Sequence, residues 1–233
     1  MPPRPQSTDE LRFFDPRAHI AQAKNRLPHW DQHGVACFIT FRLADSIPQE
    51  KLAQWGSERS TWFAANPPPH SEEQERAYHA RFTACIEEWL DAGSGSCVLR
   101  DPSVRVFVAG ALTHFDGDRH WQHAAVVMPN HVHALFSPLP PHEMEVIVQS
   151  WKGFTARMGN RHLARTGEFW MKDYFDRLIR DAAHFWRCAR YIRRNSEKAS
   201  LRPDEFTLYE APFVREFLDA ERSGGFPAAG QRS

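Results

Sequence analysis

The sequence predicts a two-layer α+β domain in which helices pack on an antiparallel or mixed sheet. Two short apolar runs, residues 123–128 and 132–136, are separated by Pro129 and Asn130, as expected for two neighbouring strands. A third run, residues 35–43, is rich in β-branched and aromatic residues, which favours a buried strand. The hairpin-like pair argues against a doubly wound parallel sheet, because parallel neighbours need a long crossover connection.

The helices follow from apolar residues at helical spacing and from start and stop signals. Residues 48–65 are predicted to be helical, with Pro48 near the first turn, and the prolines after Asn66 break this segment. Residues 71–91 form the next predicted helix, in which Ser71 is a candidate N-cap. Further helices are expected over residues 102–115, 142–158 and 182–196.

Length and composition fit one globular domain, because the chain has 233 residues of which 42% are hydrophobic and 25% charged. We expect a disordered arm over residues 1–18 and a flexible tail over residues 216–233. A single domain is expected over residues 19–215, with a helical elaboration around residues 45–100. The chain has no apolar run of about 18 residues and a polar N-terminus, so neither a membrane helix nor a secretory signal is predicted. The four cysteines lie far apart in the sequence and are expected to be reduced thiols in a cytoplasm.

Charge is unevenly distributed, although the net charge of the chain is zero. Residues 149–202 contain 13 Lys and Arg but only 5 Asp and Glu, which gives this stretch a charge of +8 and the remainder −8. Such a stretch is a possible binding surface for a polyanion such as nucleic acid. A solvated helical face would give the same pattern. Charge alone therefore does not distinguish a nucleic-acid-binding surface from an ordinary solvated helix.

The sharpest candidate for chemistry is the pair His131 and His133 at the start of an apolar strand. Residues two apart on a strand point to the same face, so the two imidazoles would project side by side. This is the arrangement that two ligands of one divalent metal need. The chain has 13 histidines, however, and such a pair also arises by chance.

A second candidate lies on the predicted basic helix. Tyr191 and Asn195 are four residues apart and therefore share a helix face. A tyrosine phenol is a possible nucleophile, and an asparagine oxygen suits a hard cation such as Mg²⁺ or Mn²⁺. The alternative is a surface helix on which Tyr191 is a half-buried amphipathic residue.

Three further groups are less specific. The carboxylates of Asp173, Asp176 and Asp181 resemble a two-metal cluster, but pairing with the adjacent arginines is the favoured interpretation. The histidines that flank the turn before the first apolar run are expected at the surface: His114, His120 and His123. Two aromatic residues of the basic segment are candidates for stacking with DNA bases, with core packing as the alternative: Trp170 and Tyr174.

Taken in order, these motifs resemble the REP-associated tyrosine transposases, relatives of the single-tyrosine transposases of small bacterial insertion sequences in the HUH endonuclease superfamily. The family pattern runs MPNHVH, WKxxTA, W-x-x-x-Y-x-D-x-x-I-R-D and Y-I-x-x-N-P-x-K-A-G-L. The matching positions are Met128 to His133, Trp151, Lys152, Thr155, Ala156, Trp170, Tyr174, Asp176, Ile179, Arg180, Asp181, Tyr191, Ile192, Asn195, Lys198, Ala199 and Leu201. The resemblance covers about residues 26–202 with the spacing kept.

The resemblance implies an RRM-like (ferredoxin-like) antiparallel sheet with helices packed on it, plus helical insertions. It implies that His131, His133 and Asn195 bind Mg²⁺ or Mn²⁺. Tyr191 would attack a phosphate of single-stranded DNA, leaving a 5′-phosphotyrosine and a free 3′-hydroxyl. The expected partner is a palindromic hairpin of the REP type, bound by a monomer or homodimer in the bacterial cytoplasm and associated with the nucleoid. The candidate DNA-binding residues are Lys152, Arg180, Arg190, Arg193, Arg194 and Lys198.

Three positions depart from the family pattern. Ser196 stands in place of the family proline, and Ser200 in place of the family glycine. Proline and glycine normally end a helix, and both are replaced here. The sequence therefore predicts a helix that runs on or frays beyond Asn195. Met171 stands where glutamine is frequent. Two other functions stay open on the sequence: a derivative that binds hairpin DNA without cutting it, and a metal-dependent hydrolase that forms no tyrosine adduct.

Overall fold

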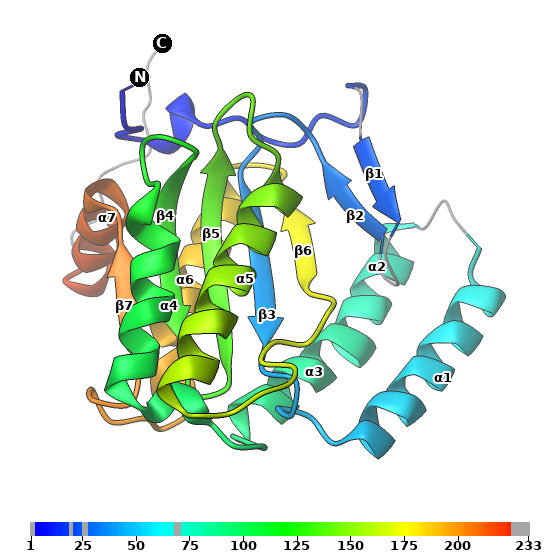
Figure 1. Cartoon of the computed structure of the whole chain (residues 1–233). Helices are drawn as coiled ribbons and strands as arrows, with labels where there is room; N and C mark the ends of the chain where they lie inside the picture. Colours follow the sequence, from blue (N-terminus) through cyan, green and yellow to red (C-terminus); the bar gives the residue numbers. More distant parts are fainter. Residues whose placement is uncertain (1–2, 19–20, 25–27, 68–70, 225–233) are drawn as a thin grey trace, which may run out of the picture.

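A five-stranded antiparallel sheet forms the centre of the computed structural model, which describes residues 3–18, 21–24, 28–67 and 71–224 (Figure 1). The spatial order of the strands is β6-β3-β5-β4-β7. Their bounds are β3 Cys37–Arg42, β4 His120–Val127, β5 His131–Pro138, β6 Phe175–Leu178 and β7 Thr207–Glu210. The tail from residue 225 onward lies outside the described residues, as do residues 26 and 27 at the start of the family resemblance.

The topology is that of a ferredoxin-like fold. In chain order β3, α4 (Pro102–His114), β4, β5, α5 (Met144–His162) and β6 form a β-α-β-β-α-β unit. This unit gives the spatial order β6-β3-β5-β4, and β7 then pairs with the free edge of β4. The predicted α+β class and ferredoxin-like sheet are therefore confirmed. The predicted hairpin is β4 and β5, with Met128 N donating to His131 O across its turn.

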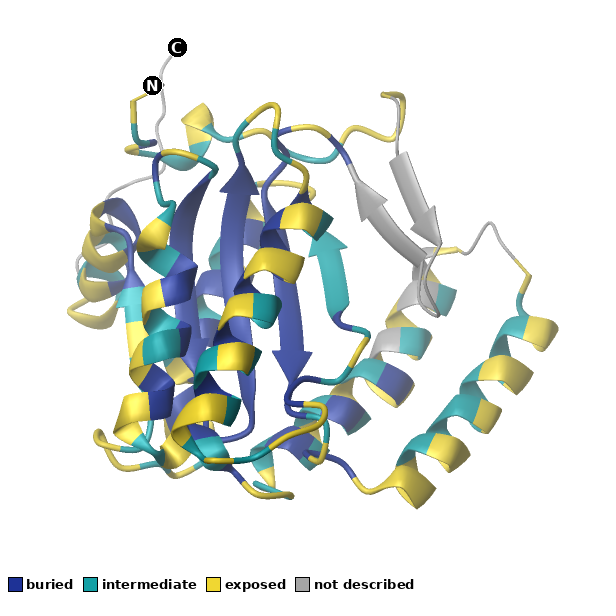
Figure 2. Ribbon diagram, in the orientation of Figure 1, coloured by how far each residue is buried: buried dark blue, intermediate teal, exposed yellow. Residues whose placement is uncertain are grey.

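Helices cover both faces of the sheet, so the two-layer arrangement expected from the sequence is wrong. Helices α4 and α5 pack on one face around Phe41 and Phe136, and α6 (Ala182–Lys198) and α7 (Pro212–Arg222) lie on the other (Figure 1). Every residue of β3, β4 and β5 is buried (Figure 2). Strands buried on two faces read as continuous apolar runs, which is why these were apparent in the sequence.

The helical elaboration lies between β3 and α4 in the chain and beyond the β6 edge of the sheet (Figure 1). Its helices are α1 Gln49–Ala65, α2 Glu72–Tyr78 and α3 Ala84–Asp91, with a π-helical segment His79–Thr83 between α2 and α3. Ile47, Ile86 and Leu90 form a small core of its own. Helix α1 has no buried residue, whereas α3 lines a pocket with β3 and β6 and pairs its Asp91 with Lys198 of α6.

The described ends of the chain pack on the sheet domain. Arg4 and Arg12 lie in the segment that was expected to be a disordered arm. Arg4 pairs with Asp116 at 2.6 Å, and Arg12 forms a β-bridge with Val35. Helix α7 runs to Arg222 and buries Leu218, although residues 216–222 were assigned to a flexible tail. The remaining short elements are η1 Thr8–Glu10, β1 Ala21–Lys24, β2 Pro28–Asp31 and η3 Val98–Arg100.

Two histidines expected at the surface are buried. His120 Nε2 bonds to Leu112 O at 2.8 Å, and His123 Nε2 bonds to Ser137 Oγ at 2.9 Å. His123 lies where the β4–β5 register shifts. Burial lowers the pKa of His123 to about 3. The imidazole rings of His120 and His123 are therefore part of the packed interior and do not lie on a solvated turn. His114 is exposed as expected. None of the helices in the described part of the chain has the length and hydropathy of a membrane span.

Helix α6 runs three residues past Asn195 and then ends sharply, although it has neither of the family stop residues. Ser200 adopts the left-handed conformation with φ 52°, which glycine normally supplies. Ser200 N donates to Glu197 O at 2.9 Å, and Leu201 N donates to Ser196 O at 3.0 Å. These two bonds make a Schellman motif, so the cap is present without the residue that favours it.

Ser200→Gly is therefore expected to stabilise the protein. Glycine removes the left-handed penalty of a Cβ but loses more entropy on folding, so the net gain is about 0.5–1 kcal/mol. That gain corresponds to a rise of about 2 °C in the melting temperature. Ser223, which follows α7 with φ −84°, provides the control, since Ser223→Gly relieves no strain. A rise in melting temperature with both substitutions, or no rise with either, would contradict this explanation.

Candidate active site

Two histidines meet on the central strand of the sheet, on the face that α6 covers. His133 lies opposite Thr40 of β3 in the antiparallel register, and His131 lies two residues earlier on the same face of β5. Both are only 1% exposed, and their Nε2 atoms are 3.0 Å apart. The sequence prediction that the two imidazoles project side by side is confirmed.

Asn130 fixes the proton on His131. The Asn130 amide nitrogen donates to Leu90 O at 3.2 Å and to Ser94 O at 3.1 Å, so the amide oxygen must face the histidine. This oxygen lies 2.8 Å from His131 Nδ1 and accepts its hydrogen. The neutral ring then carries its lone pair on Nε2, the nitrogen that faces His133. Both carbonyls belong to the elaboration, at the end of α3 and in the loop after it.

His133 is held by a hydroxyl and by an aromatic ring. Thr40 Oγ1 lies 2.7 Å from His133 Nδ1, and the hydroxyl is able to donate or accept as the tautomer requires. The Phe38 ring stacks on the imidazole with a centroid distance of 5.5 Å. Because β3 places Phe38 and Thr40 on the face of the histidines, the strand orients His133 from two sides.

Helix α6 carries the tyrosine to this pair. Asp181 caps the start of the helix by accepting from His184 N at 2.6 Å, and Phe185 and Ile192 are buried against the sheet. Tyr191 lies on the same side of the helix, half-buried, with its hydroxyl 3.4 Å from His133 Nε2. Its ring meets His133 edge-on at a centroid distance of 5.0 Å.

Asn195, one turn beyond Tyr191, has an unusual environment. It is 1% exposed, and neither atom of its side-chain amide has a hydrogen-bond partner in the described structure. Burial dominates the pKa shifts of His131 and Tyr191, and the nearby Asn195 side chain opposes both shifts without cancelling them. Buried amides are almost always bonded, since leaving one unpaired costs about 1–3 kcal/mol. An amide kept here at that cost fits a ligand that the protein itself does not provide.

Burial sets the protonation of the site. It lowers the pKa of His131 to about 3 and that of His133 well below its usual value, so both rings are neutral near pH 7. Burial also raises the pKa of Tyr191, and the carboxylates of Glu87 and Asp91 raise it further. The phenol therefore stays protonated in the free protein. Within the described residues no three His, Cys, Asp or Glu side chains form a metal cluster, so the three-donor set here depends on the Asn195 amide.

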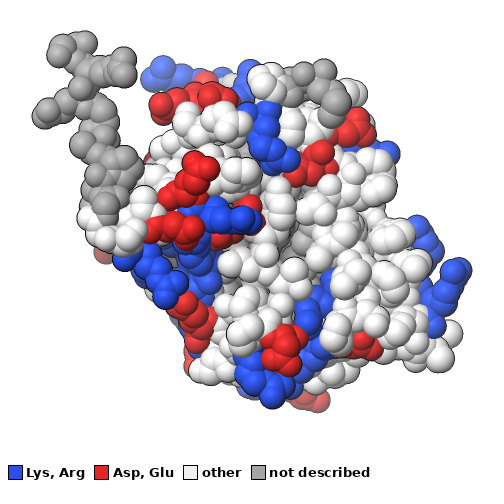
Figure 3. Space-filling model, turned by 90° about the vertical axis from the view of Figure 1, so that its left-hand side faces the viewer, with Lys and Arg blue, Asp and Glu red and all other residues white. Residues whose placement is uncertain are grey.

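The basic residues expected to contact DNA are spread over several surfaces. Arg190 pairs with Glu221 at 2.8 Å, and Arg193 bonds to Glu210 and, at 2.7 Å, to Asp219. Lysines, arginines and carboxylates are accordingly interspersed on the α7 side of the molecule (Figure 3). The remaining four are Lys152 on α5 across the sheet, exposed Arg180 and Arg194, and Lys198 near Tyr191.

The two candidates for base stacking lie in the core on the α5 side. Trp170 is 6% exposed and donates from Nε1 to Thr155 Oγ1 at 2.8 Å, and Tyr174 is 4% exposed. Trp170 packs edge-on against Phe41. The structure thus brings together Tyr191, Asn195 and the histidine pair, and it places Trp170 and Tyr174 elsewhere.

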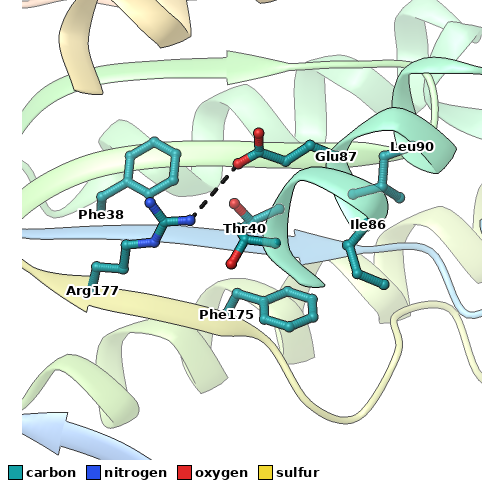
Figure 4. Close-up of a pocket in the computed structure, with 8 residues that line it drawn as sticks. Phe38, Thr40, Ile86, Glu87, Leu90, Phe175 and Arg177 are labelled. Carbon is teal, nitrogen blue, oxygen red and sulfur yellow. Dashed lines mark ion pairs between the residues drawn. The ribbon is translucent and has the colours of Figure 1, made fainter. Parts of the chain in front are cut away.

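Thr40 and Asn130 complete the site but were not among the predicted residues. Asn130 directly precedes the histidine pair in the MPNHVH motif, so its position in the motif was a usable signal. Nothing in the sequence marks Thr40, because its partner lies 93 residues away in the chain. Arg177 and Glu87 are likewise unmarked, and they line a small pocket next to Phe38 and Thr40 (Figure 4).

The fold and site together define a class: a ferredoxin-like domain in which a tyrosine and an asparagine on one helix face a histidine pair on the central strand. Residues 118–195, which contain all four of these side chains, match the family model described as "Transposase IS200 like". In this segment the chain is similar to the IS200-like transposases, which confirms the resemblance inferred from its motifs. None of the curated proteins matches the chain. Among solved structures, the REP-associated tyrosine transposase bound to a REP hairpin matches with 14% identity and a TM-score of 0.44, over 90% of this chain and 99% of that chain.

Proposed function

We propose that this protein cuts and rejoins single-stranded hairpin DNA through a covalent phosphotyrosine at Tyr191. The observation that carries this proposal is the position of the Tyr191 hydroxyl, 3.4 Å from His133 Nε2. A nucleophile thus lies beside two neutral imidazoles and an unpaired amide. The similarity of residues 118–195 to IS200-like transposases supports the same reaction class.

The donor set fits a divalent cation, with His131, His133 and Asn195 as the residues that would hold it. His131 presents a lone pair on Nε2, and Thr40 allows His133 to do the same by accepting a hydrogen from Nδ1. The amide oxygen is the donor of this set that suits a hard cation such as Mg²⁺ or Mn²⁺. A cation bound there would supply charge neutralisation at the scissile phosphate.

Residues of the chain itself orient the nucleophile and form the covalent bond to DNA. Phe38 and His133 hold the Tyr191 ring edge-on, which limits the directions its hydroxyl can take. The Tyr191 oxygen forms a bond to phosphorus while the bond from phosphorus to the 3′ oxygen breaks. The phenol gives up its proton and the departing 3′ oxygen gains one. Because the phosphodiester is exchanged for a phosphotyrosine ester, a 3′-hydroxyl can later reverse the step without ATP.

The substrate we propose is a palindromic hairpin with a single-stranded foot. The ordered family motifs over residues 26–202 support a REP-like hairpin. They are equally compatible with a protein that acts as a monomer or as a homodimer on bacterial chromosomal DNA.

Incubation of the protein with end-labelled REP-like hairpin DNA and Mg²⁺ or Mn²⁺ tests the proposal. The expected product is a protein–DNA adduct that survives denaturation, disappears with a chelator, and maps by mass spectrometry to the peptide containing Tyr191. Cleavage with both ends free would instead support a metal-dependent hydrolase. Tight binding without cleavage in either metal would support a protein that only binds hairpins.

Thr40→Val is expected to weaken metal binding by about 10–100-fold, because loss of a hydrogen bond to a ligand histidine typically has this effect. Valine keeps the shape but leaves His133 Nδ1 without its partner. Titration of Mn²⁺ followed by calorimetry measures the change directly. Thr113→Val on α4 is the control, since its hydroxyl bonds only to carbonyls of its own helix. Equal affinities in Thr40→Val and wild type would mean that His133 needs no such support.

A further inference from the structure

Two basic side chains lie near Tyr191. Arg177 of β6 lies opposite Phe38 in the sheet register, and its charge acts on both His133 and Tyr191. Lys198, at the end of α6, places its Nζ 6.0 Å from the centroid of the Tyr191 ring. A DNA strand that presents a phosphate to Tyr191 would therefore approach two cations.

One helix of the elaboration neutralises both cations. Glu87 lies 3.9 Å from Arg177, and Asp91, one turn later on α3, lies 2.6 Å from Lys198. Arg177 and Glu87 reach toward one another from β6 and α3 across the pocket beside Phe38 and Thr40 (Figure 4). Residues four apart share a helix face, so α3 presents a pair of carboxylates to the nucleophile helix.

We propose that Arg177 and Lys198 bind the DNA phosphates on the two sides of the scissile bond, and that Glu87 and Asp91 occupy them in the DNA-free protein. This inference rests on the proposed function and names the phosphate contacts of the same site. Phosphate oxygens replace the carboxylates because a DNA phosphate is as anionic as a carboxylate and arrives joined to a polyanion. The carboxylates thus act as competitors that a DNA strand must displace.

The two cations are exposed enough to exchange partners. The side chains of Arg177 and Lys198 are 34% and 53% exposed, whereas those of Glu87 and Asp91 are 25% and 11% exposed. Arg190 and Arg193 differ, because their carboxylate partners lie on β7 and α7, away from Tyr191. The two cations nearest the nucleophile are therefore a separate group from the rest of the basic helix.

Binding of a fluorescent hairpin in EDTA at several KCl concentrations tests the inference without cleavage. Arg177→Gln and Lys198→Gln should each weaken binding about 5–10-fold, and each should reduce the salt slope by about 0.7. Arg177→Lys should restore part of the loss. The double variant Glu87→Gln/Asp91→Asn should bind about 5–10-fold more tightly. Circular dichroism and melting temperature verify that each variant is folded.

A matched control separates local from long-range charge. Glu58→Gln/Glu73→Gln changes the net charge by the same amount on outer positions of the elaboration, with Glu58 paired to Arg81 at 3.3 Å. This control should leave affinity within about twofold. Unchanged or weaker binding in Glu87→Gln/Asp91→Asn, or unchanged binding in folded Arg177→Gln, would overturn the inference. Failure of the proposed function shows separately, as a wild-type protein that binds hairpins and forms no adduct.

Discussion

Tyr191→Phe is expected to abolish the covalent DNA adduct and to reduce strand cleavage by about 10³-fold or more, because removal of a nucleophile eliminates most of a cooperating site's effect. The substitution removes one oxygen and keeps the ring that packs edge-on against Phe38 and His133. Folding and hairpin binding should therefore remain close to those of wild type. Denaturing gels of labelled hairpin and an equilibrium binding titration measure the two properties separately.

Tyr209→Phe is the matched control for this experiment. Tyr209 is also a partly buried tyrosine whose hydroxyl bonds to a side chain, Asp116, at 3.0 Å, but it lies on β7 at the far edge of the sheet. It should form the adduct at the wild-type rate. An adduct of normal yield in Tyr191→Phe would reassign the nucleophile, and a loss of hairpin binding together with the adduct would point to a structural role.

Asn195→Ala is expected to change stability and activity in opposite directions. Alanine removes two buried amide atoms that have no hydrogen-bond partner and also has a higher helix propensity, so the free energy of unfolding should rise by about 1–2 kcal/mol. The same change removes a donor proposed to bind the metal, so adduct formation should fall by about 100-fold or more. Thermal melting and Mn²⁺ titration give the two readouts.

The comparison for Asn195→Ala is Asn160→Ala on α5. The Asn160 side-chain nitrogen donates to Gly167 O at 3.0 Å while its oxygen has no partner, so its removal should lower stability by at most about 1 kcal/mol and leave the adduct unaffected. A protein destabilised by Asn195→Ala would show that the asparagine serves the packing of α6. In that case the unpaired amide would no longer be evidence that Asn195 binds a metal.

The sequence predicted the sheet centre and four of the site residues because these depend on short-range pattern. His131 and His133 share a strand face by spacing alone, and Tyr191 and Asn195 share a helix face for the same reason. The edge strands β6 and β7 were not predicted, since each has only four residues and β6 contains charged side chains. Short edge strands that contain charged residues give only a weak alternation of apolar and polar residues.

The partners of charged residues could not be predicted, because they depend on tertiary contacts. Nothing in the sequence shows that Glu221 pairs with Arg190 or that Asp219 pairs with Arg193. The count of basic residues therefore overstated the cations available to DNA. The unpaired amide of Asn195 is likewise a property of the folded environment, which its residue type alone does not reveal.

The contacts of Asn130 matter for any attempt to engineer a smaller version of this protein. Removal of the elaboration would delete the Leu90 and Ser94 carbonyls, the two acceptors that keep the Asn130 amide in one orientation. The freed amide could rotate and offer its NH₂ group to His131 Nδ1, which would move the ring proton to the nitrogen facing His133. A truncated version therefore needs two replacement acceptors at that turn, or an aspartate at position 130, to keep His131 in its present tautomer.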